Sequence, residues 1–543
     1  MEALDWLVIG VFFLALIGII VWVVRQKQND SADYFLGGRD ATWLAIGASI
    51  FASNIGSEHL IGLAGAGASS GMAMAHWEIQ GWMILILGWV FVPFYTRSMV
   101  YTMPEFLERR YNPQSRTILS VISLVSYVLT KVAVTVYAGG LVFQQVFGIK
   151  ELWGIDFFWI AAIGLVVLTA LYTIFGGMKS VLYTSVLQTP ILLLGSLIIL
   201  VLGFKELGGW DEMMRVCGAV TVNDYGDTMT NLIRSNDDAN FPWLGALIGS
   251  AIIGFWYWCT DQFIVQRVLS GKNEMEARRG TIFGAYLKLL PVFLFLIPGM
   301  IAFALHQKYI GAGGEGFLPM LANGTANADA AFPTLVAKLL PAGVKGLVVC
   351  GILAALMSSL ASLFNSSAML FTIDFYKRFK PETPEKKLVG IGQIATIVIV
   401  VLGILWIPIM RSVGDVLYTY LQDVQSVLAP GIAAAFLLGI CWKRTSAQGG
   451  MWGLISGMVI GLTRLGAKVY YSNAGEVADS TFKYLFYDMN WLFFCGWMFL
   501  FCIIVVIVVS LATKAPTAEK IQGLVFGTAT KEQKAATRAS WNH

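Results

Sequence analysis

Charged side chains are scarce in this sequence. Asp, Glu, Lys and Arg make up 13% of its 543 residues, whereas soluble globular proteins carry about 25%. This deficit excludes an ordinary water-soluble domain, and the mean hydropathy of +0.70 points the same way. No stretch between the apolar runs is long enough for a soluble enzymatic domain, and no segment is of low complexity.

Cysteine is also scarce, with six residues spread along the chain. Four of them lie within apolar runs, and Cys217, in a long polar loop, has no nearby partner. The pattern therefore predicts neither a disulfide framework nor a metal cluster. Because no nucleophile–base pair or metal motif stands out, we expect no enzyme. The formal net charge of +4 is small, and no nucleic-acid partner is expected.

Long apolar runs are what the sequence has in place of charge. A membrane-crossing helix needs roughly 20 apolar residues, and about thirteen runs meet this need. The first, over 7–24, ends without a small-residue cleavage site, so it predicts a retained helix and not a signal peptide. The sequence thus predicts an all-α polytopic protein in a lipid bilayer. The expected spans are 5–24, 41–69, 71–97, 116–146, 153–174, 180–204, 241–266, 279–307, 343–375, 387–410, 415–440, 447–470 and 488–513.

Basic residues gather in alternate loops, and the opposite loops are rich in acids. The positive-inside rule places the basic loops in the cytoplasm. The N-terminus, with Glu2 and Asp5, is then outside, and the tail, with Lys514 and Lys520, is inside. The basic loops hold Arg25, Lys27, Arg39, Arg109, Arg110, Arg267, Lys272, Arg278, Arg279, Lys377, Arg378, Lys380, Lys386, Lys387, Lys443 and Arg444.

Spans two to six and seven to eleven form two groups of five. Because each group has an odd number of spans, the first helix of the second group enters the membrane from the side opposite to the first helix of the first group. Two such groups form an inverted repeat. The predicted division is an accessory helix over 1–30, a first repeat over 34–204, an outer loop over 205–240, a second repeat over 241–440, two accessory helices over 441–513 and a cytoplasmic tail over 514–543.

Two spans contain polar, helix-poor residues at equivalent places in the two groups. Span two has ASNIGSEH over 52–59, and span seven has GFWYWCTDQ over 254–262. Interrupted helices at matching points of two halves indicate a binding site near the membrane midplane. Unwound backbone is tolerated at that depth where it lines a cavity or a ligand.

Ionisable residues within the spans cost about 2.5–3.5 kcal/mol each on insertion scales. They are Glu58, His59, Glu78, Lys131, Asp261, Lys288 and Asp423. Lys131 and Asp261 fit a structural pair at least as well as a functional one. Glu78 and Lys288 lie deep in apolar segments, so we expect them to face one cavity and to bind hydroxyl groups as acceptor and donor.

Amide, imidazole and aromatic side chains complete this candidate site. Asn54, His59 and Gln425 add groups that suit a neutral polyhydroxylated ligand, because each hydroxyl needs both a donor and an acceptor. Trp77, Trp256, Tyr257 and Trp258 offer ring faces for the apolar side of a sugar, although any one of them is more often a packing residue.

A second candidate site lies in span nine, where Ala355 is followed by Ser358 and Ser359. Two adjacent hydroxyls facing the free carbonyls of an interrupted helix would form an oxygen cage for a hard cation. Free carbonyls that coordinate sodium are a known device of transporters. The alternative is that the serines only mediate helix packing.

Motifs in order along residues 34–440 resemble those of the sodium:solute symporter family, in particular its sodium/glucose cotransporters. The motifs are 34–39 (YFLGGR), 52–57 (ASNIGS), 62–65 (GLAG), 256–262 (WYWCTDQ), 287–289 (LKL), 358–360 (SSL), 364–366 (FNS) and 425–426 (QS). The resemblance implies a five-plus-five inverted-repeat core of the leucine-transporter type. It also implies symport of a glucose- or galactose-type hexose with sodium as the coupling ion.

The resemblance also implies individual roles. Residues implied to contact the sugar are Asn54, His59, Glu78, Tyr257, Trp258, Lys288 and Gln425. Tyr257 matches the inner gate, and Leu63, Trp77 and Leu421 match the outer gate. The implied sodium ligands are the carbonyls of Ala52, Ile55 and Ala355 with the hydroxyls of Ser358 and Ser359.

The chain departs from the family pattern at several places. Ser185 stands where sugar-carrying relatives commonly have an Asp, and Ala361 stands where two-sodium members have a threonine. Both departures predict one sodium per sugar. Gly254 replaces a polar side chain, and Glu58 adds a carboxylate beside His59, so the exact sugar stays open.

Other functions remain alternatives to hexose symport. They are symport of myo-inositol or another neutral polyol, and a sugar sensor that does not transport. The family's animal members have a long cytoplasmic insert and a final helix that are not found here, which predicts a bacterial inner-membrane protein. The sequence makes no prediction of the oligomeric state.

Overall fold

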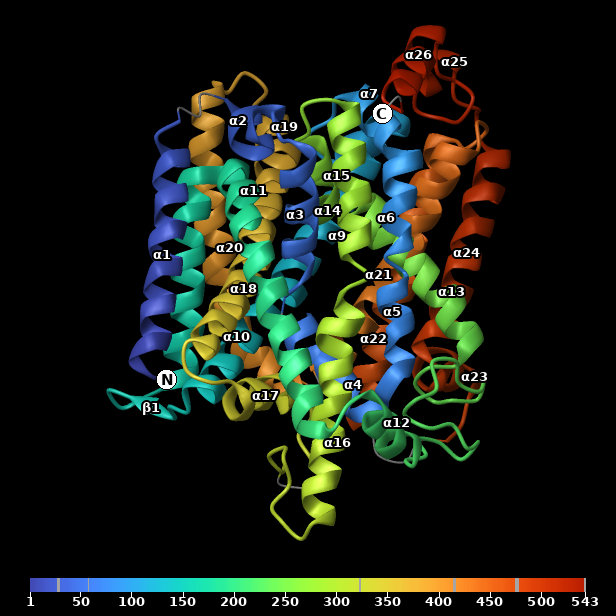
Figure 1. Cartoon of the computed structure of the whole chain (residues 1–543). Helices are drawn as coiled ribbons and strands as arrows, with labels where there is room; N and C mark the ends of the chain where they lie inside the picture. Colours follow the sequence, from blue (N-terminus) through green and yellow to red (C-terminus); the bar gives the residue numbers. More distant parts are fainter. Residues whose placement is uncertain (27–29, 57, 322–323, 414–416, 474–477, 542–543) are drawn as a thin grey trace.

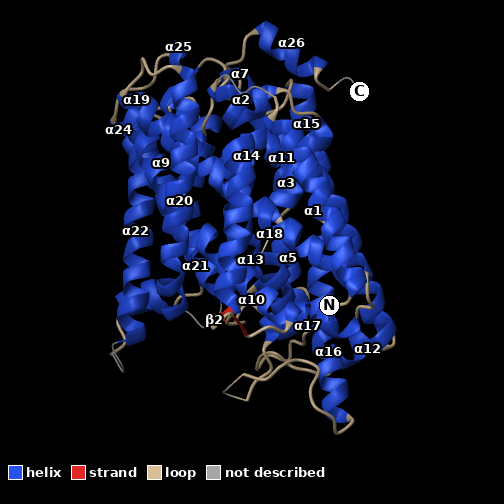
Figure 2. Cartoon of the chain, turned by 90° about the vertical axis from the view of Figure 1, so that its left-hand side faces the viewer, coloured by secondary structure: helices blue, strands red, loops and turns tan. Residues whose placement is uncertain are grey.

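The structure is a computed structural model that describes residues 1–26, 30–56, 58–321, 324–413, 417–473 and 478–541. It is dominated by long helices whose axes are roughly aligned and along which the chain runs up and down (Figures 1 and 2). The strands of the described residues are two short ones, β1 (Glu151–Leu152) and β2 (Ile155–Asp156), which pair antiparallel as a hairpin. The chain termini lie at opposite ends of the molecule (Figure 1).

The first group of helices runs from the N-terminus to α12, which lies within the predicted outer loop over 205–240. They are α1 (Ala3–Val24), α2 (Ser31–Leu36), η1 (Gly37–Arg39), α3 (Trp43–Asn54), η2 (Glu58–Leu63), α4 (Ala64–Ser70), η3 (Gly71–Met74), α5 (Ala75–Ile79), α6 (Trp82–Ile86), η4 (Leu87–Phe91), α7 (Val92–Ser98), α8 (Met103–Arg110), α9 (Pro113–Ser126), η5 (Tyr127–Val132), α10 (Ala133–Phe147), α11 (Phe157–Leu207) and α12 (Trp210–Gly218).

The second half begins with α13. Its helices are α13 (Trp243–Gly254), η6 (Phe255–Thr260), α14 (Gln262–Leu269), α15 (Glu274–Leu287), η7 (Val292–Leu296), α16 (Ile297–Gly311), η8 (Ala328–Ala330), α17 (Ala331–Leu339), α18 (Val344–Met369), η9 (Leu370–Tyr376), α19 (Lys377–Phe379), α20 (Glu385–Val413), α21 (Leu417–Cys441), α22 (Ala447–Asn473), α23 (Thr481–Lys483), η10 (Tyr484–Asp488), α24 (Trp491–Ala512), α25 (Ala518–Ile521) and α26 (Lys531–Ala539).

Nine helical segments of the described residues are long and apolar enough to cross a membrane. The predicted number of thirteen is not confirmed by this count and stays a prediction. Part of the difference has a physical cause. α11 counts once, but its 51 residues would extend about 77 Å as one helix, and the chain breaks helical geometry inside it at Gly177, with φ 54° and ψ −150°. Interrupted helices such as α3 and α10 are individually short, with 12 and 15 residues.

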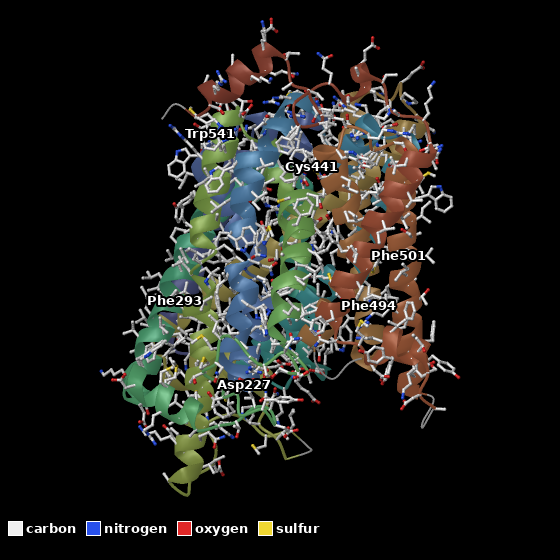
Figure 3. The ribbon with its side chains drawn as sticks, turned by 90° about the vertical axis from the view of Figure 1, so that its right-hand side faces the viewer. Asp227, Phe293, Cys441, Phe494, Phe501 and Trp541 are labelled. Atoms are coloured by element: carbon white, nitrogen blue, oxygen red, sulfur yellow. The ribbon has the colours of Figure 1, made fainter. Side chains whose placement is uncertain are left out.

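Central and peripheral helices differ in where their apolar side chains lie. In the most apolar stretch of the segment Val344–Phe379, which contains α18, 89% of residues are buried inside the protein, against 22% in α1 and 33% in α24. Phe501 of α24 is half-exposed and points outward (Figure 3). Large apolar side chains on the outer face are what a lipid environment requires, because water would oppose their exposure.

The first predicted interruption is confirmed. α3 ends at Asn54, and Ile55 has extended backbone angles, φ −79° and ψ 96°. Helical structure resumes at Glu58 as the π-helical turn η2; Ser57 lies outside the described residues. The Ile55 N–H still donates to the Phe51 carbonyl at 3.0 Å, whereas the Ser53 carbonyl accepts from the side chain of Ser359, so the break brings the end of α3 into contact with α18.

The second predicted interruption is also confirmed. α13 passes into the π-helical turn η6, and Asp261 is then extended, with φ −75° and ψ 128°. The Asp261 side chain accepts a hydrogen bond from the backbone N–H of Phe263 and so caps α14. Capping by Asp satisfies one of the free N–H groups at the start of a helix.

The C-terminal segment returns across one end of the molecule after α24 (Figure 1). Its last helix, α26, lies against the ends of α7 and α15. Arg97 of α7 donates a hydrogen bond to Thr537 Oγ1. Arg278 of α15 donates to Ser540 Oγ at 2.5 Å, and its guanidinium lies 4.0 Å from the centre of the Trp541 ring. The predicted tail is thus folded onto the helix bundle.

Candidate functional site

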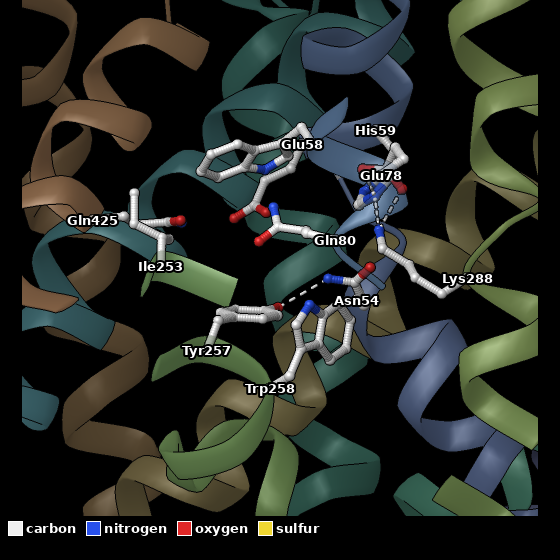
Figure 4. Close-up of a pocket in the computed structure, with 11 residues that line it drawn as sticks. Asn54, Glu58, His59, Glu78, Gln80, Ile253, Tyr257, Trp258, Lys288 and Gln425 are labelled. Atoms are coloured by element: carbon white, nitrogen blue, oxygen red, sulfur yellow. Dashed lines mark hydrogen bonds and ion pairs between the residues drawn. The ribbon is translucent and has the colours of Figure 1, made fainter. Parts of the chain in front are cut away.

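A cavity lies where the two interrupted helices face each other. The cavity is narrow, with a free volume of about 30 Å³, which is room for a few water molecules. Side chains from η2, α5, η6 and α21 surround it (Figure 4). The lining residues are Asn54, Glu58, His59, Trp77, Glu78, Gln80, Ile253, Tyr257, Trp258, Lys288 and Gln425.

The structure brings all seven predicted sugar-contacting residues to this one cavity. They come from five places in the sequence, between Asn54 and Gln425. Five of the seven side chains expose 6% of their surface or less, and Tyr257 and Gln425 expose 8% each. The cavity therefore exists as predicted, while the binding role of each residue stays a prediction.

Glu78, Lys288 and His59 form a compact triad at one wall of the cavity. Lys288 Nζ lies 2.6 Å from Glu78 Oε2 and 2.7 Å from His59 Nε2. Glu78 Oε1 lies 3.2 Å from the same histidine nitrogen. In one tautomer of His59, Nε2 accepts from the ammonium of Lys288, and in the other it donates to the carboxylate of Glu78. Nδ1 is buried and has no partner among the described residues.

Tyr257 and Asn54 meet at another part of the cavity wall, below the triad in Figure 4. Asn54 Nδ2 donates to Tyr257 Oη at 3.0 Å. The Tyr257 and Trp258 rings pack edge to face, with centroids 4.9 Å apart. The contact links the last residue of α3 to η6, so the two interrupted helices touch through these side chains.

Of the predicted outer-gate residues that the structure describes, Trp77 lines the cavity and Leu63 does not. Trp77 lines the cavity, and its ring lies 5.5 Å from that of Trp491 on α24. Leu63 is buried, with 1% of its surface exposed, and does not line the cavity. The side chain of Leu421 lies outside the described residues.

Lys131 and Asp261 form an ion pair away from the main cavity. Lys131 Nζ lies 2.8 Å from Asp261 Oδ2, and Tyr127 donates its hydroxyl to Oδ1 of the same carboxylate. Four aromatic rings surround the ammonium at 4.5 to 5.6 Å from their centres. The structure thus confirms that Lys131 and Asp261 pair with each other, as the structural interpretation of these two residues predicts. The pair joins the turn η5 to the start of α14.

The predicted sodium residues gather where α18 crosses the end of α3. Ser359 Oγ donates to the Ser53 carbonyl at 2.7 Å, and Ser358 Oγ lies 3.3 Å from Ser185 Oγ. A Cβ at Gly56 would lie 2.6 Å from Ser359 Oγ, so only glycine allows this approach. Ala52, Ile55 and Ala355 are buried beside these hydroxyls. A neutral cluster of oxygens suits a hard monovalent cation.

Gln80 and Ile253 are lining residues that the sequence did not predict. Gln80 directly follows α5, two residues after Glu78, and its amide approaches Gly254 so closely that any side chain there would collide with it. An amide thus fills the space left by the missing polar side chain at Gly254. The only feature of the sequence that pointed to Gln80 as a lining residue was its position two residues after Glu78.

Comparisons with known proteins agree with this architecture. The model of the sodium:solute symporter family matches residues 34–457. The sodium/myo-inositol cotransporter 2 of Mus musculus is 36% identical over 542 residues, covering 97% of this chain and 80% of that protein. The sodium/glucose cotransporter 4 of Danio rerio is also 36% identical, covering 96% and 80%. A solved Na⁺-coupled sialic acid symporter superposes with a TM-score of 0.75 at 21% identity, covering 95% of this chain and 99% of that one.

These comparisons confirm the all-α, inverted-repeat fold class and the resemblance to the sodium/glucose branch. The protein is a multi-pass membrane transporter and not an enzyme, with sodium as its coupling ion and a small molecule as its cargo. The limits predicted for the two repeats stay predictions. The chain belongs to the sodium:solute symporter family.

Proposed function

We propose that this protein carries a hexose of the glucose or galactose type across the membrane together with one sodium ion. The observation that carries the proposal is the cavity lined by carboxylate, ammonium, imidazole, amide and indole groups. A sugar presents hydroxyls that both donate and accept, and it has an apolar ring face. The cavity offers matching acceptors, donors and aromatic faces.

Each implied contact residue has a chemical role in this proposal. Glu78 and Lys288 accept from and donate to sugar hydroxyls, and Nδ1 of His59 adds a donor or an acceptor, according to its tautomer. Asn54 and Gln425 provide amides that do both. Tyr257 closes the cavity on the inner side, as the inner gate, and Trp77 closes it on the outer side.

Sodium couples to the sugar through the end of α3. A sodium ion held by Ala52, Ile55, Ala355, Ser358 and Ser359 ties α3 to α18 and fixes Asn54 and His59 in position for sugar. Sugar binding closes the outer gate, and the two predicted repeats, 34–204 and 241–440, then rearrange to open the inner side. Sodium leaves before the sugar or with it.

One sodium per sugar sets the limit of accumulation. A charge crossing about 100 mV releases about 2.3 kcal/mol, and a tenfold sodium gradient adds about 1.4 kcal/mol. Together they allow roughly 500-fold accumulation. The departures at Ser185 and Ala361 support the single sodium.

A cyclic polyol such as myo-inositol is the second candidate substrate. The observation in its favour is the chain's similarity to proteins that carry this substrate: the sodium/myo-inositol cotransporters 2 of Mus musculus and Homo sapiens are each 36% identical to this chain. The cavity chemistry serves either substrate, because both offer a ring of hydroxyls around an apolar face.

The orientation follows from the basic loops. We propose that the N-terminus lies outside and the C-terminus in the cytoplasm, which agrees with their opposite ends in Figure 1. The membrane is proposed to be the inner membrane of a bacterium.

The test is uptake of labelled glucose, galactose and myo-inositol into proteoliposomes, with and without an inward sodium gradient. Sodium-driven accumulation of glucose or galactose supports the proposal, and accumulation of myo-inositol alone selects the second candidate. Saturable sugar binding without accumulation of any of the three contradicts both and favours a sensor.

A further inference from the structure

Glu58 is a carboxylate of the cavity that the implied sugar contacts do not include. It is the first residue of η2 and directly precedes His59. It lines the main cavity (Figure 4) and also a second, smaller one, which Tyr257 lines as well. Within the described part of the chain, its carboxylate takes part in no ion pair or hydrogen bond, unlike Glu78 in the neighbouring triad.

The other charges around the main cavity cancel. Glu78 and Lys288 are 2.6 Å apart and neutralise each other, and His59 is neutral when Lys288 donates to its Nε2. Glu58 is then the one uncompensated charge among the eleven lining residues. A carboxylate in a narrow cavity at membrane depth is costly unless a cation accompanies it.

The cation of the second cavity is already engaged. Lys131 lines that cavity together with Glu58, but its ammonium is 2.8 Å from Asp261 and lies among four aromatic rings. Because Lys131 and Asp261 cancel as well, the residues that line the two cavities together retain the single negative charge of Glu58. Arg267, which donates to Ser53 Oγ beside the second cavity, lines neither cavity.

The remaining free groups of the main cavity fit an ammonium. Asn54 Oδ1 is a buried acceptor without a partner among the described residues, on a side chain that is 6% exposed. The rings of Trp77, Tyr257 and Trp258 line the same space, and aromatic faces attract ammonium groups when water is excluded. Carboxylate, amide oxygen and aromatic faces together favour a cationic over a neutral ligand.

We propose that the preferred substrate of this transporter is a sugar or cyclic polyol that carries an ammonium group, and that Glu58 selects it. This inference rests on the proposed function and narrows its substrate class. The hydroxyls bind the triad and amides as described above, and the ammonium binds between Glu58 and the aromatic faces. One transport cycle with an aminated substrate then moves two charges, one on sodium and one on the substrate.

The test measures sodium-driven uptake in proteoliposomes at about pH 6, where a primary amine of ordinary pKa near 8 is protonated. Glucosamine is compared with glucose and with N-acetylglucosamine, whose amide is neutral. The wild-type protein is expected to take up glucosamine at an apparent affinity at least about tenfold better than N-acetylglucosamine. Glu58→Gln is expected to remove most of this preference while changing the affinity for glucose by less than about threefold. Glu212→Gln, which removes a carboxylate on α12 away from the cavity, is the matched control and should keep the preference.

Current and uptake measured together add a second readout. Two charges per glucosamine and one per glucose support the proposal. If Glu58→Gln weakens glucose and glucosamine equally, Glu58 binds a hydroxyl, and the proposal is overturned. If the variant instead shifts the sodium dependence with unchanged selectivity, Glu58 serves the coupling ion, and the proposal is again overturned. Absence of sodium-driven uptake of every sugar tested contradicts the proposed function itself, whereas glucose uptake without a glucosamine preference contradicts only this inference.

Discussion

Two buried carboxylate–ammonium pairs of similar length lie at two neighbouring cavities, both of which Tyr257 lines. Glu78 and Lys288 are 2.6 Å apart, and Asp261 and Lys131 are 2.8 Å apart. The first pair forms part of a cavity wall. The second meets only the smaller cavity, through Lys131; we call it the enclosed pair because its carboxylate also accepts from Tyr127 and caps α14, and aromatic rings lie around its ammonium. The two pairs have similar N···O distances and are similarly buried, and they differ in the groups that surround them.

The difference shows how surroundings decide what a buried ion pair can do. The Asp261 carboxylate of the enclosed pair accepts from Lys131, Tyr127 and the Phe263 N–H, so the pair holds η5 against α14. The cavity pair lines the main cavity, so we expect a ligand there to share its hydrogen-bonding groups. We therefore expect the enclosed pair to govern stability and the cavity pair to govern substrate affinity.

The largest effect is expected at a site that belongs to neither pair. Changing both Ser358 and Ser359 to Ala removes the predicted sodium hydroxyls and should abolish sodium-stimulated uptake, while both ion pairs stay intact. Ser366→Ala, about two turns along α18, is the control and should retain stimulation. Unchanged sodium dependence in the double variant would remove these serines from the sodium site.

The enclosed pair should show the next largest effect. Lys131→Met leaves Asp261 buried without its cation, and loss of one partner of a buried pair costs about 3–5 kcal/mol. We expect a marked fall in melting temperature in detergent. The double variant Lys131→Met with Asp261→Asn removes both charges and should regain much of the loss. A single variant as stable as the wild type would contradict the structural role.

The cavity pair should give the opposite outcome. Glu78→Ala should weaken sugar binding by about tenfold or more, since a charged hydrogen bond is worth about 1.5–3 kcal/mol. Sodium binding should stay intact, and the melting temperature should fall less than in Lys131→Met, because water in the cavity can solvate Lys288. Calorimetric titration with sugar and with sodium separates the two effects. Wild-type sugar affinity would exclude Glu78 from the site.

The smallest expected effect is on the charge moved per sugar molecule, which is one for a single sodium ion and two for a pair. Ser185, beside Ser358, and Ala361 lack the groups implied for a second sodium site, so one charge should accompany each molecule of neutral sugar. Simultaneous measurement of current and labelled glucose tests this ratio. A value near two would mean that a second sodium binds through other residues.

Much of the site could be predicted because its residues lie in dense local motifs. The polar interruption after Ala52 and the aromatic run after Gly254 were visible as breaks in apolar sequence, and both are breaks in the structure. That Glu78 and Lys288 face one cavity was predicted from their depth, since a charge within the membrane is costly unless it serves a site or finds a partner; their direct pairing at 2.6 Å was not predicted.

Other features depend on contacts that no local pattern records. Gln80 becomes a lining residue only because folding places its amide against Gly254. Lys131 and Asp261 are 130 positions apart, and each could equally have reached a membrane surface by itself. The number of spans stays a prediction because breaks such as the one at Gly177 fall within continuous apolar sequence.

The folded C-terminal segment offers a way to observe the inner face during transport. Phe526 donates its backbone N–H to the Ile440 carbonyl at 2.9 Å, next to Cys441, the one exposed cysteine of the six. A spin label on Cys441 would report on the end of α21, and a second label on an introduced cysteine at exposed Lys534 would report on α26. Because α26 is attached to α7 and α15, the distance between the labels would follow the movement of those helices without any probe in the cavity.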